Sequence, residues 1–199
     1  MMHAIHAALR RDLGRLDRAA SLDLADPDVR AAVARGWDLF KTHLHVHHTA
    51  EDTDLWPRLR ERLGDQPECL AILAAMEQEH RLIPPALAAV DEALAARDPG
   101  RLRTAAAELR GVTESHLSHE ESSALPLIER TLTEADWRTL LHEQRRLTEP
   151  AKRPVFLTWL LDDVPAPLAD AVLAELPGPA RLVYRGVLRP RYRRQRRWA

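Results

Sequence analysis

Histidine and glutamate recur at a fixed spacing in two parts of the chain. His47 is followed four residues later by Glu51, and His116 is followed four residues later by Glu120. A four-residue step in an α-helix turns the side chain by about 40° and rises by about one turn, so each pair projects from one helix face. Imidazole and carboxylate together suit iron, manganese or zinc, and a carboxylate can bridge two ions. Each pair therefore predicts part of a metal site.

The two pairs belong to a longer repeat. Residues 45–57 and 114–126 align on Pro57 and Pro126, and the alignment keeps the histidine and the glutamate of each pair. One such pair is common on solvated helix faces, but two copies within a repeat are much stronger evidence for a site. Each pair also lies within an apolar stripe of its helix, where a carboxylate requires a cation or a hydrogen-bonding network.

A single histidine on the preceding helix completes each copy of the repeat. His6 and His80 are both followed by Leu after seven residues and by Asp after eleven. The repeat thus predicts two metal ions, each with about two histidines and a share of two bridging carboxylates. The six predicted inward ligands are His6, His47, Glu51, His80, His116 and Glu120.

The elements that must position these ligands are helices. The 199 residues are 45% apolar, include only seven Gly and show no sustained alternation of β-branched residues, which predicts an all-α fold. Pro57 and the pair Pro84 and Pro85 are expected to bend the helices that contain them. Four long helices joined by short loops predict an up-down four-helix bundle, with helices at residues 2–20, 27–63, 67–96 and 101–130.

The chain changes in character after this bundle. We predict a four-helix domain over residues 1–130 and a helical extension with a basic tail over residues 131–199, in which a fifth helix ends near residue 148 and prolines separate short helices. The extension carries 13 Arg and Lys against 8 Asp and Glu, although the whole chain has a net charge of −1. Without a recognition-helix motif, we expect the arginine cluster at residues 189–197 to be solvated and expect no nucleic-acid partner.

Cysteine content and hydropathy limit the compartment. Cys69 is the only cysteine, so no intramolecular disulfide can form. No apolar run approaches the length of about 20 residues that spans a bilayer, and the first residues lack a signal-peptide pattern. We therefore expect a cytoplasmic protein without a membrane span. Its oligomeric state is left open, with a homodimer as one option.

The order of the ligands along four helices resembles the hemerythrin-like, or HHE cation-binding, family of non-haem di-iron bundles. The resemblance covers roughly residues 1–130 and rests on His6, His47-x-x-x-Glu51, His80 and His116-x-x-x-Glu120. It implies that these residues hold two iron ions with an oxo or hydroxo bridge. Members of the family bind dioxygen, sense oxygen or iron, or act on peroxide or nitric oxide.

Two positions depart from the oxygen-carrier pattern of that family. Met76 stands four residues before His80, where the carriers resemble His-x-x-x-His, and Glu121 competes with Glu120 as the acid of the last helix. Helix geometry and the repeat favour Glu120. The other nearby histidines of the second helix, His43, His45 and His48, are expected to be solvated or to lie next to the ligands without binding metal. His43 is one turn from His47, so the edge of the site is open to it.

A count of coordination positions favours peroxide. Two six-coordinate irons with four histidines, two bridging carboxylates and one further bridge keep about one open position each, so hydrogen peroxide could span both metals. We therefore predict a catalase-like reaction, with Glu77 or His119 moving protons. The alternatives are an O2 or NO binding and sensing protein, or an iron-linked regulator that uses the basic tail.

Overall fold

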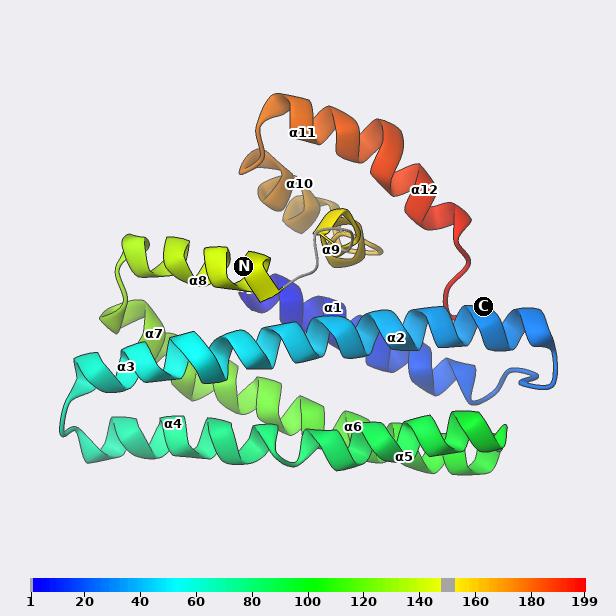
Figure 1. Cartoon of the computed structure of the whole chain (residues 1–199), viewed down its shortest axis with the longest axis horizontal. Coiled ribbons are helices and arrows are strands. Elements are labelled where there is room, and N and C mark those ends of the chain that lie inside the picture. Colours follow the sequence, from blue (N-terminus) through cyan, green and yellow to red (C-terminus); the bar gives the residue numbers. More distant parts are fainter. Residues whose placement is uncertain (1, 148–152) are drawn as a thin grey trace. The chain divides into compact units, whose positions relative to one another are not determined.

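Helices form all the regular structure of the part of the chain that a computed structural model describes, residues 2–147 and 153–199 (Figure 1). The all-α prediction is confirmed for these residues. None of these helices combines the length and apolar character needed to cross a membrane. The elements are α1 (Met2–Ala19), α2 (Pro27–Ala50), η1 (Glu51–Leu55), α3 (Trp56–Leu63), α4 (Pro67–His80), α5 (Ile83–Ala96), α6 (Pro99–His119), η2 (Glu120–Ala124), α7 (Leu125–Thr131), α8 (Glu134–Leu147), α9 (Arg153–Leu160), α10 (Ala166–Ala174), α11 (Gly178–Val183), η3 (Tyr184–Leu188) and α12 (Arg189–Arg194).

The chain divides into two compact units. The terminal unit comprises Met1–Phe40 and Glu149–Ala199, and the central unit comprises Lys41–Thr148. The predicted division of the chain into domains at residue 130 stays a prediction. The central unit contains all the predicted metal ligands except His6, which lies in α1 of the terminal unit.

Three long helical segments run alongside one another in the central unit (Figure 1). The end of α2 continues through η1 into α3, α4 leads into α5, and α6 continues through η2 into α7. The helix α5 packs along α6, while α4 contacts α3, α6 and η2. A capping side chain starts α6, because Asp98 Oδ1 accepts hydrogen bonds from the amides of Gly100 (2.9 Å) and Arg101 (3.0 Å). The predicted metal ligands of this unit lie on these three segments.

A π-turn interrupts each long segment that carries a His-x-x-x-Glu pair. In η1 and η2 the amide of the following residue donates to a carbonyl five residues back instead of four. A proline ring crowds the carbonyl four residues before it, and one extra residue in the turn accommodates this without ending the helix. The bend expected at Pro57 thus takes the form of a π-turn. Each of the three π-turns begins six residues before a proline: Glu51 before Pro57, Glu120 before Pro126, and Tyr184 before Pro190.

The segment that carries His80 is broken beside this residue. The helix α4 ends at His80, and α5 begins at Ile83 after a two-residue turn. Pro84 and Pro85 lie in the first turn of α5, where a missing amide hydrogen costs little. The distortion expected from these prolines is therefore a break, and it leaves His80 as the last residue of a helix.

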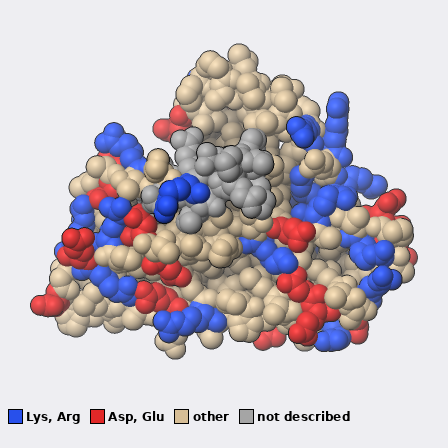
Figure 2. Space-filling model, in the orientation of Figure 1, with Lys and Arg blue, Asp and Glu red and all other residues tan. Residues whose placement is uncertain are grey.

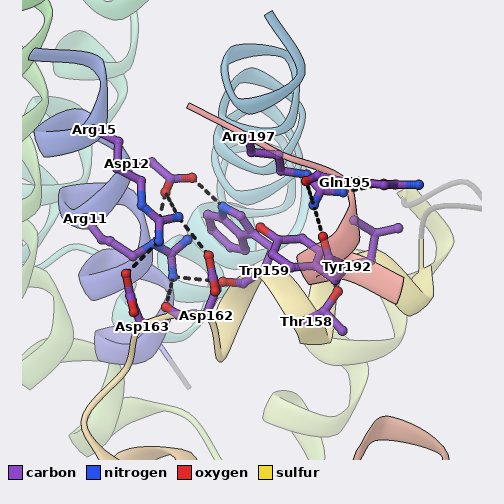
Figure 3. A network of polar contacts seen from close by, with 11 residues as sticks. Arg11, Asp12, Arg15, Thr158, Trp159, Asp162, Asp163, Tyr192, Gln195 and Arg197 are labelled. Carbon is purple, nitrogen blue, oxygen red and sulfur yellow. Dashed lines mark hydrogen bonds and ion pairs between the residues drawn. The ribbon is translucent and has the colours of Figure 1, made fainter. Parts of the chain in front are cut away.

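A buried polar network joins α1 to α9 within the terminal unit (Figure 3). The Trp159 indole Nε1 donates to Asp12 Oδ2 at 2.7 Å, and Asp12 is 1% exposed. Arg15 bridges Asp12 and Asp162 at 3.2 and 2.8 Å, while Arg11 donates to the Trp159 carbonyl at 2.9 Å. The helix α9 therefore belongs to the same core as α1.

The basic tail packs against the terminal unit through its aromatic residues. Tyr192 and Trp198 are both buried, and the Trp198 amide donates to the Ala32 carbonyl at 2.9 Å. The guanidinium of Arg197 lies 3.8 Å from the centre of the Tyr192 ring. Basic side chains gather around α12 (Figure 2). The expectation of a solvated cluster at residues 189–197 thus holds for most of its arginine side chains, whereas Tyr192 within it is buried.

Candidate metal centre

Four buried side chains of the central unit bring potential ligand atoms together. His80 Nε2 lies 3.2 Å from His116 Nε2 and 3.5 Å from Glu51 Oε2. These residues come from α4, α6 and η1, and a fourth comes from α2. One ligand atom from each lies within 4.8 Å of the others, in the set His48, Glu51, His80 and His116.

Two carboxylates connect this set to His47. The Nδ1 atom of His47 lies 3.1 Å from Glu51 Oε1, so Glu51 stands between His47 and His80. Glu120 has one carboxylate oxygen 3.9 Å from His116 Nε2, and one within 4.8 Å of a ring nitrogen of His47. Each carboxylate therefore lies near histidines of two helices.

The buried position of Glu51 is unfavourable for a charged carboxylate. The side chain is fully buried, and neither oxygen forms a hydrogen bond within the described residues. Burial raises the pKa of Glu51 well above its ordinary value, and the charges of Glu120 and Asp52 raise it further. An ionised carboxylate without a compensating partner costs several kcal/mol in such a place. A bound cation would remove this cost, so Glu51 fits a metal site.

The orientation of His80 and His116 also fits a metal. His80 Nδ1 lies 2.8 Å from Asp52 Oδ1, and His116 Nδ1 lies 3.1 Å from Glu79 Oε2. An imidazole that donates its Nδ1 hydrogen to a carboxylate presents the lone pair of Nε2 on its other side. The pKa of His116 is lowered by burial and by His80, against the opposing effects of Glu120 and Glu79, which favours the neutral ring. Two such lone pairs face each other here, and a cation would accept both.

The residues predicted to move protons lie at different distances from this cluster. His119 Nδ1 contacts Glu79 Oε1 at 2.7 Å, so Glu79 joins His119 to His116. Glu77 instead forms an ion pair with Arg60 at 2.7 Å, so its carboxylate is engaged with α3. The sequence reading missed Glu79 because its partners are on another helix, at a spacing that no single-helix pattern contains.

Burial separates the histidines of α2. His45 is exposed, as expected, but His43 and His48 are buried, so a solvated position is wrong for both. The signal for His48 was present in the sequence. With His47 taken as 0°, Glu51 projects at about 40° and His48 at about 100°, so one arc of the helix can carry all three.

The other two predicted ligands are also buried. His6 lies on the buried side of α1 together with Ile5 and Leu9. Glu120 is fully buried at the start of η2, whereas Glu121 is partly exposed. This burial agrees with the choice of Glu120 over Glu121, and the assignment of each ligand stays a prediction.

The comparison with known families gives one match. The family described as Hemerythrin HHE cation binding domain matches residues 1–128. No curated protein and no solved structure matches the chain. The family match covers more than half of the 199 residues and includes the whole cluster of buried histidines and glutamates. The chain belongs to the hemerythrin HHE cation-binding family, as the order of its histidines and glutamates indicated.

Proposed function

We propose that the HHE domain of this protein holds two iron ions and lets them react with a small oxidant. The observation that carries this proposal is the pair of Nε2 atoms of His80 and His116, 3.2 Å apart, next to the buried carboxylate of Glu51. Membership of a cation-binding family supports a cation at this point. The up-down arrangement of the four long helices is part of the same proposal.

The internal repeat supports the allocation of ligands to two ions. The copies are equivalent in sequence, so each ion receives one histidine from a His-x-x-x-Glu pair and one lone histidine. His80 and His116 serve one ion, and the repeat assigns His47 and His6 to the other. Both carboxylates lie near histidines of more than one helix, which supports bridging roles for Glu51 and Glu120.

Iron bound by these ligands would supply one-electron redox chemistry and a position for a small oxidant. The chain itself orients the ligands, because Asp52 and Glu79 accept hydrogen bonds from the outer nitrogens of His80 and His116. His119, whose side chain is 37% exposed, continues this row toward solvent through Glu79. The row can hold a proton between the buried ring and the surface.

Metal analysis of the purified protein tests the two-ion proposal. After anaerobic loading with ferrous iron, we expect about two irons per folded chain. His47→Ala or Glu120→Ala should remove most of the bound metal, while His45→Ala, an exposed residue on the same helix, should not. A folded protein that retains less than one iron, or equal losses in all three variants, would refute the proposal.

Hydrogen peroxide is the first candidate oxidant. Its support is the sequence count of about one open position on each of two irons with four histidines. Oxygen evolution after the addition of peroxide to the iron-loaded protein measures the reaction, and His80→Ala serves as the inactive control. If the His80→Ala variant still evolves oxygen, the reaction does not take place at this site.

Binding of O2 or NO is the second candidate. It is favoured by the position of His48, which lies close enough to His80 and His116 to reduce the number of open positions. A reversible change in visible absorption on exposure to O2, without turnover of peroxide, would select this candidate. The two candidates thus share the site and differ in the measured reaction.

A further inference from the structure

We infer that His48 is itself a metal ligand and gives one ion of the pair a third imidazole, next to His80 and His116. This inference rests on the proposed metal site and adds a ligand that the His-x-x-x-Glu pattern does not contain. It makes the two ions unequal, since the repeat supplies no equivalent histidine for the other ion.

The surroundings of His48 are those of the other ligands. Its side chain is buried, and one of its ring nitrogens lies within 4.8 Å of ligand atoms of Glu51, His80 and His116. The His48 ring stacks on the His80 ring, with centroids 4.1 Å apart and planes at 19°. It meets the His116 ring edge-on, with centroids 5.1 Å apart and planes at 89°. Three imidazoles and one carboxylate around a single point form a donor set suited to iron, zinc or manganese.

The internal repeat shows that packing alone does not require histidine at this position. When the two copies are aligned on their prolines, His48 corresponds to Leu117, which is fully buried. An apolar leucine side chain therefore fills the equivalent buried position in the second copy. The first copy instead places a buried polar ring there, next to the rings of His80 and His116. Ligation of a cation would account for this difference between the copies.

Unequal ions have a chemical consequence. An ion held by His48, His80 and His116 would have more of its positions filled by protein, so it should bind more tightly and be less open to small molecules. This favours a ligand that binds to one ion over one that spans both.

Titration with Co2+ tests the inference, since its visible absorption reports the number and type of ligands. The matched variants are His48→Leu, which copies the residue of the second repeat, and His45→Leu at an exposed place on the same helix. We expect about two Co2+ ions in the wild type and in His45→Leu. In His48→Leu one of the two Co2+ ions should bind at least about 10–100-fold more weakly, because even the loss of a residue that only hydrogen-bonds to a ligand has an effect of this size. The visible spectrum of the bound Co2+ should also change.

Chemical rescue separates ligation from packing. In His48→Gly, added imidazole should restore the tight Co2+ site and its spectrum, which a purely structural role of His48 would not allow. Circular dichroism of the metal-free variants checks that they fold. If the wild type binds two ions and His48→Leu gives the same affinities and spectrum, the inference is wrong and the proposed metal site stands. If the wild type itself binds no metal, the proposed function fails and the inference fails with it.

Discussion

Replacing Glu51 by glutamine should change the stability of the protein in opposite directions with and without metal. The carboxylate is fully buried, forms no hydrogen bond within the described residues, and has a raised pKa because of burial and its acidic neighbours. In the metal-free protein the ionised form is therefore unfavourable. Glu51→Gln replaces the ionisable group by a neutral amide at nearly constant volume.

The expected size follows from two opposing effects. Replacing a buried ion pair by apolar residues is neutral or stabilising by up to about 1–4 kcal/mol, and we take this range as the upper bound for removing one buried carboxyl group. The new amide also lacks partners, and an unsatisfied buried amide costs about 1–3 kcal/mol. We therefore expect Glu51→Gln to raise the free energy of unfolding of the metal-free protein by about 1 kcal/mol. For a chain of this length this corresponds to roughly 2–4 °C in Tm. With metal present, the variant should lose a ligand-linked stabilisation of about 2.7 kcal/mol at a hundredfold excess of metal over Kd.

The pH dependence follows from the direction of the pKa shift. A carboxyl group whose pKa is raised in the folded state contributes stability below its unfolded pKa and loses this contribution as pH rises through the folded pKa. Without metal, the Tm of the wild type should therefore be lower than the Tm of Glu51→Gln, and this difference should grow as pH is raised from about 5 to 8.

Thermal unfolding followed by circular dichroism measures both effects. Glu77→Gln is the matched control, because Glu77 pairs with Arg60 away from the cluster, and its effect should stay within about 0.5 kcal/mol. The reasoning would be refuted if metal-free Glu51→Gln were less stable than the wild type at pH 8, or if metal stabilised both proteins equally.

Three further substitutions test other contacts. Glu79→Gln should weaken Fe2+ binding by about 10–100-fold while leaving helicity unchanged, because Glu79 orients His116; competition with a chelator measures this. Gly36→Ala should lower the free energy of unfolding by about 1–3 kcal/mol, because a Cβ there would overlap the Trp198 indole, and Trp198→Ala in the same chain should recover part of the loss in urea denaturation. Asp12→Asn should cost about 1–3 kcal/mol in the same assay, because it weakens a buried hydrogen-bond network.

The parts of the fold that could be predicted from the sequence depend on local spacing. Helical periodicity predicted the long segments, and the His-x-x-x-Glu repeat predicted which side chains share a face. Periodicity could not tell a continuous helix from one with a π-turn, because a single extra residue changes the hydrogen bonds and leaves most of the apolar stripe in place. A bend near His80 was expected from Pro84 and Pro85 because proline crowds the preceding turn, and the structure has a break between α4 and α5 there.

The contacts that the sequence did not predict join different helices. Asp52 meets His80 and Glu79 meets His116 across helix boundaries, and nothing in the spacing along one helix records these partners. The tail was misjudged for another reason. Its many arginines suggested a solvated segment, yet Tyr192 and Trp198 decide its position, because one buried aromatic ring outweighs several charges that remain in water.

The repeat also indicates which features position the metals and which features alter their chemistry. Both copies keep the proline and the π-turn that begins at the glutamate, so both carboxylates are presented in the same way. The polar row toward solvent is specific to one copy. Glu79 corresponds to Ile5 and His119 to Ala50, and both of these apolar residues are buried. His48, a buried histidine of α2, also lies next to His80 and His116. Within the proposed pair of ions, the one held by His80 and His116 would therefore have the Glu79 and His119 row behind it, which the internal repeat does not duplicate.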